Sequence, residues 1–118
     1  MRFLNGSGKE SREGKVIRLV DEAGDSGVIE GIHFKDCHVK GPAVMVVQGE
    51  FDLLRNTIEG DPDAFLWEIL PDRERVTGAI LVKDTTFEEC TFTNVGLAGY
   101  SDFIEQVRQG VEARHAIS

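Results

Sequence analysis

The sequence predicts a mainly β fold, a short parallel stack of three to four coils of the β-solenoid or β-helix type, with a C-terminal capping α-helix. Three observations predict it. Short β-branched segments bounded by glycine or proline run through most of the 118 residues. One short pattern returns along the chain, and an amphipathic segment near the C-terminus has the spacing of a helix face.

The repeated pattern reads apolar, two polar residues, Cys, polar, apolar, polar, and then Gly or Asn. It occurs at residues 34–41 and 87–94, with a weaker copy at 53–60, so the steps are 53 − 34 = 19 and 87 − 53 = 34 residues. Each copy predicts a strand, a tight bend and a second strand. Because one copy cannot bury its apolar face alone, the copies are expected to stack. The alternative is three strands of an ordinary sandwich that share a pattern.

The residue at the bend is Cys37 in the first copy, Asn56 in the second and Cys90 in the third. A buried thiol packs as a small hydrophobe, and an amide can bond to the backbone of the bend. If the three coils follow sequence order, the two sulfurs lie about 9–10 Å apart, two strand spacings. At that separation they cannot form a disulfide.

The chain divides into a flexible N-terminal arm (1–14), a β domain (15–99) and a C-terminal helix and tail (100–118). Residues 5–14 are Gly/Ser-rich and charged, which is typical of an exposed segment. Strands are expected at residues 16–20, 28–34, 43–47, 65–70 and 76–82. The helix is expected at about 101–110, with Ser101 as its N-cap and Gly110 at its end.

The composition argues against several classes of partner. Thirteen basic and 21 acidic residues give a net charge of 13 − 21 = −8, which would repel nucleic acid and anionic membranes. No segment approaches the ~20 apolar residues that span a bilayer, and no signal peptide is evident. We therefore expect no nucleic-acid or membrane partner and a cytoplasmic protein whose two cysteines stay reduced.

No constellation of catalytic or metal-ligating residues stands out. His33, Cys37 and His38 lie close in sequence, but strand alternation would turn His33 outward and Cys37 inward. Zinc needs three or four convergent ligands, and a nucleophilic cysteine needs an exposed thiol with a lowered pKa. We expect no catalytic residue, no metal and no cofactor.

Four acidic residues flank the middle of the chain: Asp61, Asp63, Asp72 and Glu74. Paired carboxylates could do acid–base work on a glycan. A chain of this length has no room for a long sugar groove, and Asp-Pro-Asp at 61–63 reads more simply as a turn.

Two short segments are candidates for binding. Gly96, Gly99 and Ser101 form a bend before the helix, where backbone amides can bind an anion, so they are a weak candidate site for a phosphate-bearing ligand. Phe65, Leu66 and Trp67 are apolar on both faces of one strand, which makes them a candidate interface with a partner.

The segments 78–80, 87–92, 94–99 and 103–105, together with 41–43 and 60–68, resemble a group of small bacterial proteins without an assigned function. The resemblance covers roughly residues 30–110. More loosely, the repeat resembles the coils of right-handed parallel β-helix proteins. It supports the fold and implies no catalytic residues.

These observations favour a non-enzymatic interaction or scaffold module that self-associates, most simply as a homodimer, because a short stack exposes two ends. A separate protein partner is also possible. The first alternative is a small-ligand binder with its pocket between the helix, the 96–99 bend and the middle insertion. The second is a minimal glycan-active hydrolase or lyase.

Overall fold

The structure, a computed structural model, describes residues 10–72 and 76–117, with the backbone alone for 111–117. The strands are β1 (Glu10–Glu13), β2 (Val16–Arg18), β3 (Val28–Glu30), β4 (Ile32–Lys35), β5 (His38–Leu54), β6 (Thr57–Ile58), β7 (Leu66–Glu68), β8 (Ile80–Glu88) and β9 (Thr91–Gly99). The helices are α1 (Leu19–Ala23), α2 (Pro62–Phe65) and α3 (Ser101–Ile117), with a 3₁₀ turn, η1, at Gly24–Ser26.

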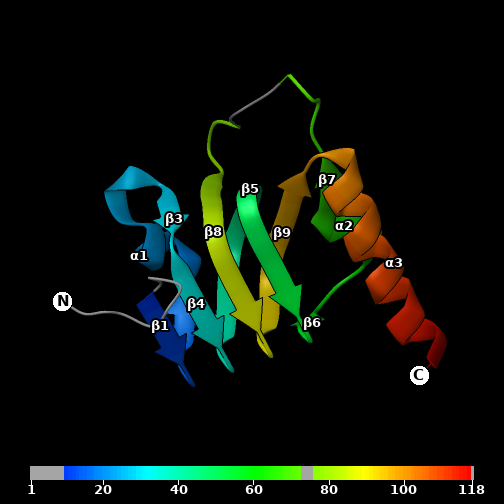
Figure 1. The fold of residues 1–118 in the computed structure, drawn as a ribbon, viewed down its shortest axis with the longest axis horizontal. Coiled ribbons are helices and arrows are strands. Elements are labelled where there is room, and N and C mark those ends of the chain that lie inside the picture. Colours follow the sequence, from blue (N-terminus) through cyan, green and yellow to red (C-terminus); the bar gives the residue numbers. More distant parts are fainter. Residues whose placement is uncertain (1–9, 73–75, 118) are drawn as a thin grey trace.

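The strands of the described residues form one sheet, and all their pairings are parallel. The main path runs β1-β4-β8-β5-β9-β6, with β2 on β5, β3 on β8 and β7 on β9. This confirms a mainly β fold with a parallel sheet and a C-terminal helix. The sheet is open and does not curl closed on itself. Helix α1 lies beside one end of the sheet and α3 beside the other (Figure 1).

The three copies of the sequence pattern form bends that stack on one another. The residue before each bend position has a left-handed φ: Asp36 at 54°, Arg55 at 57° and Glu89 at 54°. The amide of Thr91 donates to the Cys37 carbonyl at 3.0 Å, and the amide of Thr57 donates to the Cys90 carbonyl at 2.9 Å. The spatial order is therefore Cys37, Cys90, Asn56.

This order corrects the expected register. Because β8 pairs with β4 on one side and with β5 on the other, the last copy in the sequence lies between the first two in space. Cys37 and Cys90 are thus on adjacent strands, about 4.8 Å apart along the stack, and the expected two-strand separation is wrong. Both are free, buried thiols.

Asn56 completes the stack at its outer position. Its side-chain nitrogen donates to the Phe87 carbonyl at 2.9 Å, and its side-chain oxygen accepts from the Cys90 amide at 2.7 Å. The predicted role of this amide, bonding the backbone of a bend, is confirmed. Asn56 is 3% exposed, so both bonds satisfy groups that would otherwise be buried without partners.

The N-terminal part of the chain differs from the prediction. Residues 10–13 are not an arm but strand β1, paired with β4, because their backbone continues the parallel ladder. Residues 1–9 of the expected arm lie outside the described residues. The strand expected at 16–20 ends at Arg18, and Leu19–Ala23 form α1, with acidic residues in its first turn and Gly24 after it.

The middle of the chain also differs. The strand expected at 43–47 is part of the 17-residue β5, which passes through Gly41 and Pro42 without ending. The strand expected at 65–70 is present but shorter, as β7, and it follows the short helix α2, which ends at Phe65. Helix α2 has Asp61 as its N-cap and proline in its first turn, a standard helix start. Helix α3 continues through Gly110 to Ile117.

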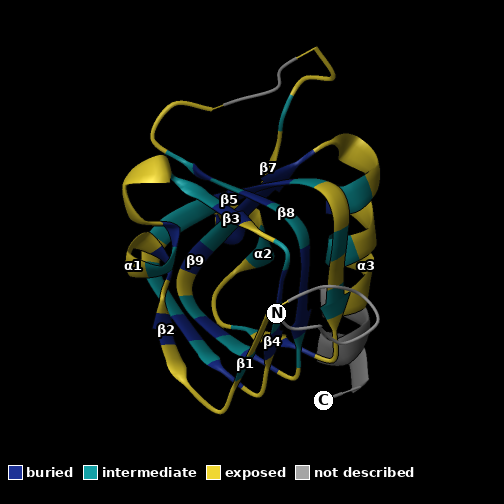
Figure 2. Ribbon diagram, turned by 60° about the vertical axis from the view of Figure 1, so that its left-hand side comes forward, coloured by how far each residue is buried: buried dark blue, intermediate teal, exposed yellow. Residues whose placement is uncertain are grey.

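The core is built on phenylalanines of neighbouring strands. Phe34 and Phe87 stack at 4.7 Å between ring centroids, and Phe87 meets Phe92 edge-on at 5.0 Å. All three are almost fully buried. Figure 2 shows buried residues following the strands, while α1 and α3 turn exposed residues outward.

Candidate functional site

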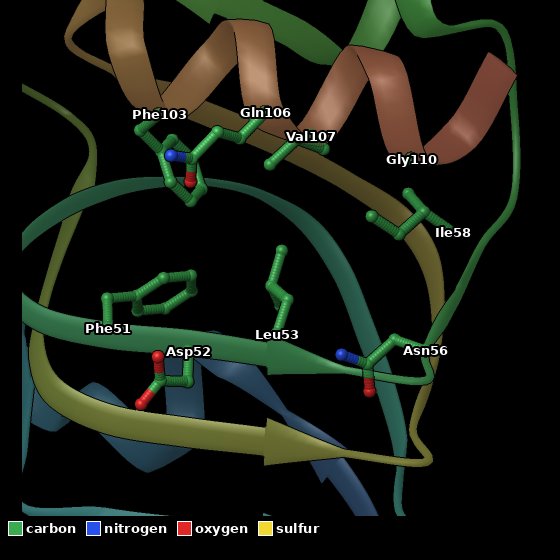
Figure 3. Close-up of a pocket in the computed structure, with 9 residues that line it drawn as sticks. All are labelled: Phe51, Asp52, Leu53, Asn56, Ile58, Phe103, Gln106, Val107 and Gly110. Atoms are coloured by element: carbon green, nitrogen blue, oxygen red, sulfur yellow. The ribbon is translucent and has the colours of Figure 1, made fainter. Parts of the chain in front are cut away.

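A cleft of about 330 Å³ lies between α3 and the end of the β stack. Phe51 and Leu53 of β5 and Ile58 of β6 form one wall, and Phe103 and Val107 of α3 form the other. Figure 3 shows these side chains facing one another across the opening. This volume is at the lower end of the ~300–1,000 Å³ typical of small-molecule sites.

The cleft is where the hydrophobic core is least complete. Of the six partly buried hydrophobic residues that pack against the core in the described chain, five form these two walls: Phe51, Leu53, Ile58, Phe103 and Val107. The sixth, Ala43, lies elsewhere. The apolar surface of the cleft is therefore an interruption of close packing, which is uncommon in a protein interior.

The sequence of α3 explains why the cleft stays open. Ile104 is buried, and Phe103 and Val107 reach the stack, as the predicted apolar face requires. On the same side, Gln106 and Gly110 occupy positions where larger apolar residues would close the gap. A Cβ atom placed on Gly110 would meet no atom within 4 Å.

The walls are supported by the core behind them. Phe103 meets Phe51 edge-on with centroids 5.5 Å apart, and Phe51 lies 5.9 Å from Phe87. A chain of ring contacts thus runs from the centre of the sheet to α3. The rings hold α3 against the stack at its N-terminal half, so the cleft continues toward Gly110 (Figure 3).

Among the described lining residues, Gln106 supplies the polar side chain that is available to a ligand. Asn56 also lines it, but both ends of its amide are bonded to the backbone. Asp52 projects from the opposite side of β5 to Phe51 and Leu53 (Figure 3). The arrangement offers apolar walls and one amide able to donate or accept a hydrogen bond.

The predicted ligand residues do not form this cleft. A Cβ on Gly99 would lie 2.8 Å from Phe103 Cδ2, and one on Gly96 would lie 3.3 Å from Val44 Cγ2. These glycines are therefore explained by close packing: the absent side chain at Gly99 lets α3 approach the sheet. Ser101 is an exposed residue and the first residue of α3 rather than its predicted N-cap, because the Tyr100 carbonyl accepts the first helical hydrogen bond, from the Ile104 amide at 3.1 Å.

The predicted interface is reduced to one residue. Phe65 and Leu66 are each 6% exposed, so they belong to the core, whereas Trp67 is 53% exposed. The reason is that α2 turns the chain inward before β7, and β7 pairs with β9 so that Leu66 lies opposite Leu97. Of the three residues predicted as an interface, Phe65 and Leu66 thus lie in the core and Trp67 is the exposed one.

The histidine and cysteine side chains that lie close together in the sequence do not converge on one site in the structure. His33 Nε2 lies 3.0 Å from Glu88 Oε1, and its hydrogen bond is the largest cause that lowers the pKa of Glu88. His38 Nε2 lies 2.8 Å from Thr93 Oγ1. In the described part of the chain, no three potential metal ligands come together.

The two thiols are unlike those of catalytic cysteines. Cys37 and Cys90 are 3% and 1% exposed. Burial raises the pKa of Cys90 to about 11, so its thiol is protonated at neutral pH, whereas a nucleophile needs the thiolate.

The acidic residues of the middle segment serve local structure. Asp61 Oδ1 accepts from the Asp63 amide at 2.9 Å and caps α2, while Asp63 pairs with Arg108 at 2.8 Å. Asp72 lies exposed in a turn, and Glu74 lies outside the described residues. Asp61 and Asp63 are thus used as a cap and an ion pair.

Comparison with protein-family models, with curated proteins and with solved structures gave no match. Among the described helices, none is long and apolar enough to cross a membrane.

The sequence analysis missed the residues of the α3 cleft, although the sequence holds one signal for them. Leu53 and Ile58 are apolar positions of the weakest repeat copy, which is the copy that ends the stack.

Proposed function

We propose that the protein is a non-enzymatic binding module that takes a small apolar ligand in the cleft under α3. The observation that carries the proposal is the concentration of partly buried hydrophobic residues on the two walls of this cleft. Contact with a ligand would remove apolar surface from water, which contributes about 25 cal/mol per Å².

The chemistry of the walls limits the ligand. Aromatic rings from both sides (Phe51 and Phe103) favour a flat or short-chain apolar group. The Gln106 amide can bond one neutral polar atom of the ligand. Of the lining residues that the structure describes, only Asp52 is charged, and it points away, so these residues offer no partner to an ionised head group (Figure 3).

Fluorescence titration with N-phenyl-1-naphthylamine tests the proposal, because this neutral dye emits strongly in apolar surroundings. Wild-type protein is expected to bind it at one site. Val107→Phe fills the cleft and is expected to weaken binding at least about tenfold, a loss of roughly 1.4 kcal/mol.

The matched control is Gln109→Phe, which adds the same ring to α3 at a residue that does not line the cleft. It is expected to leave the affinity of the cleft unchanged. Absence of dye binding to the folded wild-type protein, or an equal loss in both variants, would contradict the proposal.

We also propose that the stacked bends are the minimal form of a β-solenoid. Support comes from three bends in register, each preceded by a left-handed residue and joined by parallel backbone hydrogen bonds. The open sheet is the feature that a full solenoid would not have.

We also propose a cytoplasmic, reducing location for the protein, supported by the two free thiols.

Self-association is a second candidate function, favoured by the N-terminal edge of the sheet. Among the described strands β2 pairs only with β5, and two apolar residues here are exposed: Val16 on β2 at 66% and Val20 in α1 at 56%. Such an edge can add a strand from a second copy. Sedimentation velocity is expected to show a dimer that Val16→Lys dissociates. A monomeric wild-type protein at tens of micromolar would contradict it.

A further inference from the structure

A second groove, of about 560 Å³, is lined in part by Trp67 and shares no lining residue with the α3 cleft. Its lining residues come from α2, from β7 and from the segments around Val44 and Gly96. The indole Nε1 donates to the Ala64 carbonyl at 2.9 Å, which holds the ring in place. With 53% of the residue exposed, the ring stays accessible, and it is the chain's only tryptophan.

The charge in this groove is of one sign. Its charged lining residues are Glu59 and Asp61, and no lysine or arginine lines it in the described part of the chain. Glu59 Oε1 accepts from Thr93 Oγ1 at 3.0 Å, and Asp61 Oδ1 accepts from a backbone amide. Both partners are neutral, so neither bond compensates the negative charge.

The arginine that contacts α2 is already paired. Arg108 of α3 bonds Asp63 at 2.8 Å, and Asp63 is outside the groove. Among the described residues, Glu59 and Asp61 take part in no ion pair. The groove thus combines an exposed aromatic face with two uncompensated carboxylates on a molecule of net charge −8.

We propose that this groove docks an extended basic segment of a partner protein. An arginine of that segment stacks on the Trp67 indole, and its neighbours lie toward Glu59 and Asp61 (guanidinium groups both stack on aromatic rings and pair with carboxylates). Charge complementarity selects this occupant over an acidic one and steers its approach. It also disfavours a second copy of this acidic chain. The inference is independent of the ligand proposed for the α3 cleft.

Fluorescence anisotropy with a labelled peptide of alternating arginine and alanine tests the proposal at low ionic strength. The wild-type protein is expected to bind this peptide and not to bind the peptide in which glutamate replaces arginine. Trp67→Ala is expected to weaken binding at least about tenfold. Leu70→Ala removes an equally exposed apolar side chain from the same segment, is outside the groove, and is expected to change nothing.

A second pair of variants separates the groove from general attraction to an acidic surface. Glu59→Gln with Asp61→Asn removes both charges while asparagine keeps the helix cap, and the double variant is expected to lose about tenfold in affinity or more. Glu68→Gln removes an exposed charge next to Trp67 that does not line the groove, and is expected to have less than about a twofold effect.

Three results would overturn the proposal: no binding of the basic peptide, equal losses in the groove variants and their controls, or equal binding of the acidic peptide. A wild-type dimer in sedimentation that Trp67→Ala dissociates would also overturn it, because the occupant would then be a second copy. Circular dichroism of each variant confirms that the fold is retained.

Discussion

The two ends of the β stack are covered by helices that differ in length and in how well they close the core. At one end the five-residue α1 buries Leu19 completely and Ala23 almost so. At the other end the 17-residue α3 buries only Ile104, at 6% exposed, among its described side chains and leaves Phe103 and Val107 partly exposed. The shorter helix therefore covers its end of the sheet with the more closely packed core.

The difference lies in the residues that face the sheet. Beside α1, Arg12 of β1 takes the position opposite Phe34, and its guanidinium bonds Glu22 of α1 at 3.1 Å. Beside α3, the facing positions include an amide at Gln106 and no side chain at Gly110. Coverage by a helix therefore does not imply a filled core, and the unfilled end is the one suited to a ligand.

The largest expected effect is at the closed end. Leu19→Ala would leave a cavity among fully buried neighbours and is expected to lower the free energy of unfolding by about 3–5 kcal/mol. Chemical denaturation measures it. A loss below about 1 kcal/mol would mean that α1 does not seal the stack.

The same substitution at the open end is expected to have a smaller effect. Leu53 is only partly buried and already borders a cleft, so Leu53→Ala is expected to lower the unfolding free energy by about 1–2 kcal/mol. The two variants are matched in chemistry. Equal losses in the same denaturation experiment would remove the distinction between the ends.

A gain is expected from Gly110→Ala. Glycine inside a helix costs about 0.5–1 kcal/mol relative to alanine, and the new Cβ would meet open space. The thermal midpoint is therefore expected to rise. The contrasting control is Gly99→Ala, whose Cβ would lie 2.8 Å from Phe103 and which is expected to lower the midpoint. A lower thermal midpoint in both Gly110→Ala and Gly99→Ala would indicate that α3 packs against the stack without leaving the cleft.

The ion pairs at the two ends give the smallest contrast. Glu22 is 17% exposed where it bonds Arg12, whereas Asp63 is 83% exposed where it bonds Arg108. Glu22→Gln is expected to cost about 0.5–1 kcal/mol, and Asp63→Asn close to nothing. Chemical denaturation of the two variants measures these losses of stability. A larger loss from Asp63→Asn than from Glu22→Gln would contradict the expectation that the less exposed ion pair contributes more.

Sequence patterns predicted the parts of this molecule that depend on local alternation. The repeat placed the bends at Cys37, Asn56 and Cys90, and the apolar spacing of residues 103–107 placed the helix. The spatial order of the bends could not be predicted from the sequence, because β8 inserts between two strands that precede it in the chain. A repeated pattern shows that its copies stack, but it does not show which copies are neighbours.

The candidate sites were harder to predict for a related reason. Phe65, Leu66 and Trp67 are alike in sequence, and only the turn made by α2 decides that the first two are buried. The start of α2 did carry a local signal, Asp61 before Pro62, which the turn interpretation overlooked. For the α3 cleft the signal was weaker: Leu53 and Ile58 are apolar positions of the weakest repeat copy, but the sequence does not show which side of the helix meets that copy.

Methyl NMR spectra recorded during titration with benzene test the central claim most directly, because they observe both ends of the stack in one sample. The account predicts shifts for the methyl groups of Leu53, Ile58 and Val107, which line the open end. The methyl groups of Leu19 and Ile29, which are buried at the closed end, should stay unmoved. Shifts at Leu19 and Ile29, or no saturable shift at the cleft, would contradict it.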